Sequence, residues 1–235
     1  GDDYTVIGYL RRYATWQGKI FPWNEYLLHS PSVGFRWLIQ NDRHWSFVAP
    51  APSSISPKSG NGRRLSFDGE SFRLYDKGVA YVKHVLGEFY WKVEAGERAK
   101  TADFISPPRM LSFEWSGTKD SEECNVSIGT YLTVDEVEKA FKVKQISRPW
   151  GVGVIQPGPW PGNTLFILWP VFIVLLIVIF AVSNGFSSSR GGADGWLCFY
   201  AILTVSAVPL GILAYAYSFE VNRWKDSDYS PYSTE

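Results

Sequence analysis

Two long stretches without a charged residue constrain this chain more than any other feature. The first runs from Leu165 to Val182 and the second from Trp196 to Phe219. At a rise of 1.5 Å per residue, a helix over the first would be about 27 Å long, close to the hydrocarbon thickness of a bilayer. A helix of a soluble protein keeps a polar face, which neither stretch provides. The sequence therefore predicts transmembrane helices over 164–183 and 196–219.

The residues around these stretches predict a hairpin whose two ends lie on the same side of the membrane. The connector, 184–195, is short and rich in Gly and Ser, so it can only join antiparallel neighbours. Basic residues flank the hairpin at Lys142, Lys144, Arg148, Arg223 and Lys225, whereas the connector has Arg190 alone. The positive-inside rule then places the preceding domain and the polar tail, 220–235, in the cytoplasm.

Aromatic and small residues predict how the hairpin meets lipid and packs. We expect five aromatic side chains at the membrane interface: Trp160, Trp169, Trp196, Tyr215 and Tyr217. Ala207 and Gly211 are four residues apart, a spacing of small residues that allows close helix packing. Neither stretch contains Asp, Glu, Lys, Arg or His, which argues against an ion path or a proton relay.

Residues 1–146 alternate between apolar and polar side chains, which is typical of half-buried antiparallel strands. Three such apolar rows are Phe35, Trp37 and Ile39, then Phe89, Trp91 and Val93, then Leu111, Phe113 and Trp115. Turn residues separate the runs, as at Asp68-Gly69 and Asp76-Lys77-Gly78. We predict a mainly β domain of roughly eight to ten short strands, an antiparallel β-sandwich or a barrel-like fold.

One short helix should close this domain. Thr133 and Glu136 have the spacing of a capping box, and the apolar residues that follow on one helix face are Val134, Val137 and Phe141. A Pro, Gly and Trp-rich juxtamembrane linker, 147–163, follows and cannot form a regular helix.

The composition argues against several function classes. Lys plus Arg and Asp plus Glu each number 23, so the chain lacks the basic excess of a nucleic-acid binder. His29, His44 and His84 are isolated, so we expect no metal site, and no phosphate-binding or nucleophile motif predicts a cofactor or a catalytic residue. Cys124 lies in a polar stretch and Cys198 in an apolar one, so we expect both to be unpaired thiols. Unpaired thiols are typical of a reducing compartment. The chain begins at Gly1 rather than at a methionine, so we expect further residues upstream.

Three glutamates stand among aromatic residues. Glu25, Glu88 and Glu114 could bind a cation by charge and by cation–π contact, and burial could raise their pKa values. With their aromatic neighbours they form the candidate ligand-binding set: Glu25, Glu88, Glu114, Trp23, Tyr90 and Trp115. The alternative is that the glutamates face solvent, or pair with Arg36, Arg73 or Lys92 across strands.

Five short blocks in the first part of the chain carry a family resemblance. They lie within 23–28, 34–38, 44–46, 87–91 and 107–114, and include Trp23, Glu25, Phe35, Trp37, Trp45, Glu88, Phe89, Pro107 and Glu114. In this order and spacing they resemble the DUF4178 domain, a bacterial family of unknown function, over about residues 4 to 143. The resemblance implies a bacterial inner-membrane protein, since some members carry C-terminal membrane spans, and it implies no catalytic residues.

Three functions remain open from the sequence. The first is a non-enzymatic binding or scaffold module at the cytoplasmic membrane face, with the lipid bilayer and a protein partner or a second copy of the chain as its partners. The second is a receptor for a small ligand, such as a polycation, bound by the glutamates and aromatic residues. The third is an enzyme of unrecognised type, which would need a cleft with paired titratable groups.

Overall fold

A computed structural model describes residues 2–52, 55, 62–118, 121–159, 164–185 and 193–233. The chain forms two compact units. Unit 1 comprises Gly1–Pro157 together with Asn222–Glu235, and unit 2 comprises Gly158–Val221. The last residues of the chain therefore belong to the same unit as the first 157.

Among the described residues, unit 1 forms nine strands and one complete helix. The strands are β1 (Thr5–Trp16), β2 (Lys19–Ser30), β3 (Gly34–Asn41), β4 (His44–Pro50), β5 (Arg64–Phe67), β6 (Glu70–Gly87), β7 (Arg98–Ser106), β8 (Arg109–Thr118) and β9 (Ser121–Leu132). Helix α1 (Val134–Phe141) follows the last strand. The predicted capping box is present. The Thr133 side chain accepts from the Glu136 backbone N–H, and the Glu136 carboxylate accepts from the Thr133 backbone N–H.

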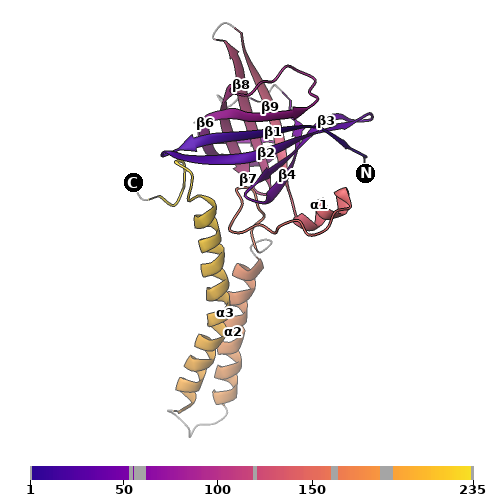
Figure 1. Cartoon of the computed structure of the whole chain (residues 1–235). Coiled ribbons are helices and arrows are strands. Elements are labelled where there is room, and N and C mark those ends of the chain that lie inside the picture. The colour runs from indigo at the N-terminus through magenta and orange to yellow at the C-terminus, as the bar shows by residue number, and fades with distance from the viewer. Residues whose placement is uncertain are drawn as a thin grey trace. The chain divides into compact units, whose positions relative to one another are not determined.

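The strands close into an antiparallel barrel (Figure 1). The strand order is β1-β2-β3-β4-β9-β8-β7-β6-β5, and an additional pairing of β1 with β6 closes a ring of eight strands. Strand β5 pairs with β6 outside that ring, through a turn at Asp68-Gly69 where both residues have positive φ. Of the two predicted architectures, the barrel is therefore confirmed.

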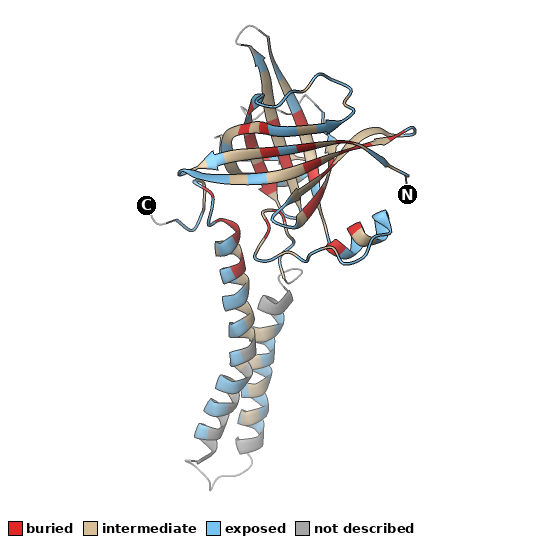
Figure 2. Cartoon of the chain, in the orientation of Figure 1, coloured by how far each residue is buried: buried red, intermediate tan, exposed pale blue. Residues whose placement is uncertain are grey.

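The largest apolar cluster lies on the outer face of the barrel. It comprises Leu65, Phe72, Leu74, Ala102, Phe104, Leu111, Phe113 and Val126. Ala51, Ile55 and Tyr229 pack against it from outside the ring. On another part of the outer face, Val134 and Val137 of α1 pack against Leu28, Leu38 and Trp45. Figure 2 shows these buried residues as red bands along the strands and on α1.

The C-terminal residues close one end of the barrel interior. Trp224 packs with Ile155 and with the inward-facing Ile105, and it lies 5.3 Å from the Tyr75 ring, centroid to centroid. The Arg223 side chain is fully buried and donates to the carbonyls of Gly153 and Val154 at 3.2 and 2.8 Å. The predicted polar tail is thus an integral part of unit 1.

Further contacts hold this tail in place. The Tyr75 hydroxyl donates to the Arg223 carbonyl at 3.0 Å, and the Ser227 hydroxyl donates to the Tyr75 carbonyl. The Trp16 indole donates to the Asp228 carboxylate at 3.0 Å. The tail is therefore bound by hydrogen bonds to two strands as well as by apolar packing.

Two local predictions are wrong. Phe89, Trp91 and Val93 are not in a strand, because the chain leaves the sheet after Gly87 and the aromatic rings pack on β3 instead. Residues 76–78 are not a turn but continue β6 past a register shift between Leu74 and Asp76. Phe141 is the last residue of α1, and its ring is 38% exposed.

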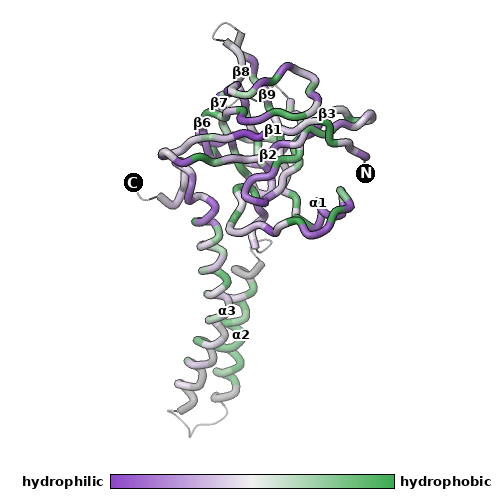
Figure 3. The backbone as a smooth tube through the Cα atoms, viewed as in Figure 1, coloured by the Kyte–Doolittle hydropathy of each residue, from purple (hydrophilic) through white to green (hydrophobic). Residues whose placement is uncertain are grey.

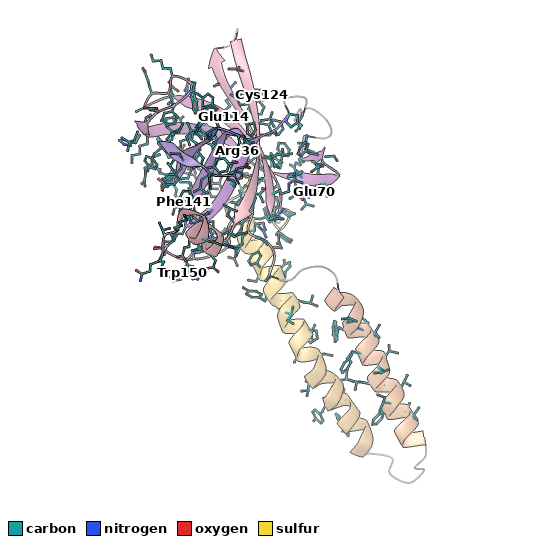
Figure 4. All side chains as sticks on the ribbon, turned by 90° about the vertical axis from the view of Figure 1, so that its right-hand side faces the viewer. Arg36, Glu70, Glu114, Cys124, Phe141 and Trp150 are labelled. Atoms are coloured by element: carbon teal, nitrogen blue, oxygen red, sulfur yellow. The ribbon has the colours of Figure 1, made fainter. Side chains whose placement is uncertain are left out.

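The long helices α2 (Thr164–Gly185) and α3 (Ala193–Arg223) are described in unit 2. The last two residues of α3 belong to unit 1. Within unit 2 the two helices run antiparallel to each other (Figures 1 and 4). By length and apolar composition, one described helix could cross a membrane, Ile202–Arg223, and a shorter apolar run covers Leu168–Val182. Of the two predicted spans, only the second meets this criterion among the described residues. Figure 3 shows apolar residues along both helices.

Candidate functional site

A cluster of charged residues crosses the interior of the barrel. Arg12 lies on β1 and Glu114 on β8, and these strands are not neighbours in the ring. The Arg12 guanidinium nevertheless donates to both oxygens of the Glu114 carboxylate, at 2.9 and 2.8 Å. Such a bidentate pair has to reach across the inside of the barrel. The inward face therefore carries Arg12 and Glu114, and the outward face carries Phe113 of the outer apolar cluster.

Glu25 completes this cluster from β2. Its Oε1 lies 3.4 Å from Arg12 Nη1 and accepts from the Trp23 indole at 2.6 Å. The Arg12 guanidinium also lies 5.8 Å from the Trp23 ring centroid. The positions follow from register, since Arg12 pairs with Trp23 and Leu10 with Glu25, and directly paired residues share a face. Arg12, Trp23, Glu25 and Glu114 are named the barrel ion cluster below.

Burial and charge compete in the barrel ion cluster. Burial raises the pKa of Glu25 above its ordinary value, although the charge of Arg12 and the Trp23 N–H act in the opposite direction. Burial lowers the pKa of Arg12, but the two carboxylates raise it more, so the guanidinium stays charged. The Arg12 Nε has no hydrogen-bond partner among the described residues. The Glu114 side chain keeps 35% of its surface exposed, against 9% for the side chains of Arg12 and Glu25.

Two further carboxylates face the same interior. Asp103 on β7 accepts from the Ser112 hydroxyl at 2.6 Å, and burial raises its pKa to about 6. Asp76 on β6 pairs with Asp103 in the sheet, and burial raises its pKa as well. The described interior thus holds four carboxyl groups near the Arg12 guanidinium, and Arg73, which pairs with the inward-facing Ile105, adds a second guanidinium at the Trp224 end.

The raised pKa of Asp103 predicts a stabilising substitution. A folded-state pKa of about 6, against about 3.9 unfolded, contributes stability below about pH 4 that is lost as the pH rises through 6. Asp103→Asn removes that loss, so we expect the free energy of unfolding to rise by about 3 kcal/mol at pH 7 and to change little at pH 4. Urea titrations of the full chain in mild detergent at both pH values measure this.

The exposed Asp3→Asn is the control for Asp103→Asn, and it should leave the free energy of unfolding unchanged at both pH values. Equal effects of Asp103→Asn at pH 4 and pH 7 would contradict the assigned pKa.

A second feature of unit 1 is a group of aromatic rings on β3 and on the segment after β6. Phe35 stacks on Tyr90 with centroids 4.3 Å apart, and Trp37 contacts Trp91 at 5.7 Å. Phe89 lies 5.2 Å from Trp91. Tyr90 and Trp91 leave 60% and 37% of their surface exposed. These five rings are named the aromatic patch.

Two glycines allow the aromatic patch to form. A Cβ on Gly8 would stand 2.8 Å from the Glu88 carbonyl oxygen and from the Phe89 ring. Gly87 has a φ of +93°, and a Cβ there would overlap the Ile7 carbonyl. The chain therefore leaves the sheet at Gly87 because β1 offers no side chain there, and this close approach brings Phe89 against Trp37.

Comparison with known families assigns this chain to a sequence family. The family described as "Domain of unknown function (DUF4178)" matches residues 1–134, more than half of the chain. The chain belongs to the DUF4178 family. No curated protein and no solved structure matches it. The DUF4178 match ends within the first turn of α1, so it contains all nine strands and none of unit 2.

The DUF4178 barrel brings together three of the six residues that the sequence suggested for a ligand. Trp23, Glu25 and Glu114 meet at Arg12, a partner that the sequence did not suggest. Glu88 is exposed after Gly87, and Tyr90 belongs to the aromatic patch. Trp115 faces outward and stacks on Phe113 at 6.0 Å. The three glutamates therefore do not share a single site.

The partners expected for the glutamates also differ from those in the DUF4178 barrel. Arg36 donates to the Phe35 carbonyl, Arg73 lies over Trp224, and Lys92 pairs with Glu94 on the surface. A signal for Arg12 was available, because Gly8, Leu10 and Arg12 share the inward face of β1. A single cation on an otherwise apolar strand face requires an acidic partner across the fold.

The residues suggested for the membrane interface lie in unit 2, outside the DUF4178 match. Trp196, Tyr215 and Tyr217 are exposed, and Trp169 is half-buried. Trp160 lies outside the described residues. Ala207 and Gly211 are exposed, and a Cβ on Gly211 would meet no described atom beyond its own helix within 4 Å. The close helix packing expected at these two residues stays a prediction.

Proposed function

We propose that this protein is a membrane-anchored binding module, in which a DUF4178 barrel is held at the cytoplasmic face of the membrane by a helical hairpin. One observation carries the anchoring: the chain leaves unit 1 at Pro157 and returns to it at Asn222. Arg223, the residue that ends the candidate span, is fully buried in unit 1 and bound to the carbonyls of Gly153 and Val154. Both ends of the helical segment are thus fixed at one place.

That geometry favours two crossings over one. The candidate span Ile202–Arg223 has 22 residues, about 33 Å of helix, which is enough to cross the hydrocarbon of a bilayer. If this segment crosses once, its start lies on the far side, while Pro157 lies on the near side with Arg223. The chain then has to cross before it, and α2, also of 22 residues, is the element between them.

The surface of α2 supports this second crossing. Its described side chains are apolar and largely exposed, with Leu168, Val171 and Val174 each leaving 59 or 60% of their surface uncovered (Figures 2 and 3). In water this exposure would be unfavourable, since about 25 cal/mol is lost for every Å² of apolar surface left uncovered. A lipid environment removes that cost. Lys142, Lys144 and Lys225 flank the helices and favour the cytoplasmic side.

The aromatic patch is the surface that we assign to protein binding. Tyr and Trp are enriched in the energetically dominant residues of interfaces, and charged residues are depleted there. In the patch, Tyr90 and Trp91 project from a segment outside the sheet and rest on the rings of β3. A partner can therefore bury them without disturbing the barrel. Ion pairing and hydrogen bonding occupy Arg12, Glu25 and Asp103 in the interior, which favours a binding role over catalysis.

Affinity purification of the full chain in mild detergent, with mass spectrometry, tests the binding role. We expect a protein partner or a second copy to accompany the wild type and to be lost with Tyr90→Ser and Trp91→Ser together. Ile20→Ser, which removes another apolar side chain that is 66% exposed, is the matched control and should retain the partner. A chain that purifies alone and as a monomer contradicts the proposal.

The four carboxyl groups of the interior favour one alternative, a receptor for a small cation such as a polyamine. Glu114 and Asp103 lie near Arg12, and Glu114 is partly exposed. Calorimetry of the full chain with spermidine distinguishes this function. The receptor function predicts that binding releases or absorbs heat and that Glu114→Gln abolishes this heat. Glu88→Gln should leave the heat unchanged, since Glu88 lies outside the barrel ion cluster. No heat with the wild type removes the alternative.

A further inference from the structure

The segment that follows α1 exposes large apolar side chains where the fold does not use them. Phe141, Val143 and Trp150 leave 38%, 45% and 89% of their surface uncovered. Phe141 continues the buried helix face of Val137, but the helix ends before its ring reaches the barrel. In Figure 4, Phe141 and Trp150 lie at the end of unit 1 where α1 is found, away from Cys124. Trp150 is more exposed than any other large apolar side chain described.

Basic side chains alternate with these apolar ones. Lys142 follows Phe141, Lys144 follows Val143, and residues 139–150 contain no Asp or Glu. Neither lysine forms an ion pair within the described part of the chain. Lys142 adopts a left-handed conformation (φ 53°) that ends the helix. The segment 141–150 thus offers apolar rings and unneutralised positive charge on an exposed surface.

The acidic residues of α1 that face this segment are already engaged. Asp135 pairs with Arg148 at 3.0 Å, and Glu136 closes the capping box with Thr133. The Glu138 carboxylate accepts from the Ile146 backbone N–H at 2.8 Å. Asp135 and Glu138 therefore hold the segment against α1, and none of these three carboxylates neutralises Lys142 or Lys144.

The chain also places Trp150 beside the end of the candidate span. Gly153 accepts a hydrogen bond from Arg223 at 3.2 Å, and Arg223 is the last residue of that span. Trp150 precedes Gly153 by three residues, which is at most about 11 Å of extended chain. A bilayer that holds the span up to Arg223 has its headgroups within reach of the Trp150 indole.

We propose that residues 141–150 form a docking surface for anionic lipid headgroups in the leaflet next to the barrel, an inference that rests on the proposed membrane anchor. Phe141, Val143 and Trp150 insert at the headgroup level, while Lys142 and Lys144 bind the lipid phosphates. Alternating apolar and basic residues suit an anionic membrane surface, where each lysine adds to the attraction. The docking fixes how the barrel is turned relative to the membrane.

A fluorescent probe at residue 150 tests this docking surface in the full chain. Trp150→Cys, with Cys124→Ser and Cys198→Ser, is labelled with an environment-sensitive dye and reconstituted into vesicles. One set contains phosphatidylcholine alone, and the other about one third phosphatidylglycerol. We expect a blue-shifted emission and quenching by brominated lipid that are both stronger in the anionic vesicles. The matched control is a probe at Glu123→Cys, next to Cys124, which should stay in water in both sets (Figure 4).

Neutralising the lysines tests the charge. Lys142→Gln with Lys144→Gln should lower the ratio of docked to undocked segment about thirtyfold in anionic vesicles, which corresponds to two contributions of about 1 kcal/mol. Equal probe signals in the two lipid compositions, or no effect of the two substitutions, would overturn the proposal.

An alkaline carbonate wash separates failure of the docking from failure of the anchor. If the probe at residue 150 stays in water while the chain resists extraction, the docking surface is refuted and the anchor stands. If the wash releases the chain from the vesicles, the membrane anchor is refuted, and the docking inference with it.

Discussion

Replacing Arg12 with leucine should lower the free energy of unfolding by about 3 to 5 kcal/mol at pH 7. The substitution leaves Glu25 buried inside the barrel with only the Trp23 N–H to stabilise its charge. An unpaired buried carboxylate is far more costly than the loss of an exposed ion pair. Urea titration of the full chain in mild detergent, followed by tryptophan fluorescence, measures the change.

Two comparisons separate the loss of the ion pair from other effects of Arg12→Leu. Arg11→Leu changes the adjacent, exposed arginine and should shift the free energy of unfolding by less than about 0.5 kcal/mol. Arg12→Leu with Glu25→Leu replaces both buried charges by apolar groups and should recover most of the lost stability. A cost below about 1 kcal/mol for Arg12→Leu alone would show that the barrel ion cluster does not hold the barrel together.

Trp224→Ala should release the C-terminal residues from the barrel. The indole is buried against Ile105 and Ile155, and truncation of a buried tryptophan costs about 3 to 5 kcal/mol. Because proteolysis follows the population of the open form, trypsin cleavage after Lys225 should become at least about a hundredfold faster. Mass spectrometry of timed digests in detergent measures that rate.

The control for this prediction is Trp150→Ala, which removes an indole that unit 1 leaves exposed. It should leave the cleavage rate after Lys225 unchanged in detergent. An unchanged rate for Trp224→Ala would mean that apolar packing of the tail does not secure it. The hydrogen bonds of Arg223 and Ser227 would then be sufficient.

Local signals in the sequence predicted the local structure well. Thr133 and Glu136 predicted the start of α1, because a capping box depends only on residues three positions apart. Asp68-Gly69 predicted a hairpin for the same reason, since its positive φ values are set within the turn. The alternation of Leu111 and Phe113 with polar residues predicted β8, although it could not tell the outer face of the barrel from the inner one.

Features that depend on distant parts of the chain were missed. Arg12 binds Glu114 across 102 residues, and alternation within one strand says nothing of which strand lies opposite. The alternation at Phe89 and Trp91 predicts a strand, but the chain leaves the sheet before them. Gly8 on β1 allows the segment after β6 to approach closely, and only the β1–β6 pairing brings the two together. The tail reads as polar, yet Trp224 is buried by Ile155, a contact made after the helical segment returns.

The most direct test of the membrane anchor is labelling of single cysteines in sealed vesicles with a membrane-impermeant maleimide. In a background with Cys124→Ser and Cys198→Ser, we compare Gly158→Cys, Gly185→Cys and Lys225→Cys in the full chain. The hairpin predicts that residues 158 and 225 react from the same side and residue 185 from the opposite side. Reaction of residues 158 and 225 from opposite sides, or of all three from one side, would contradict it.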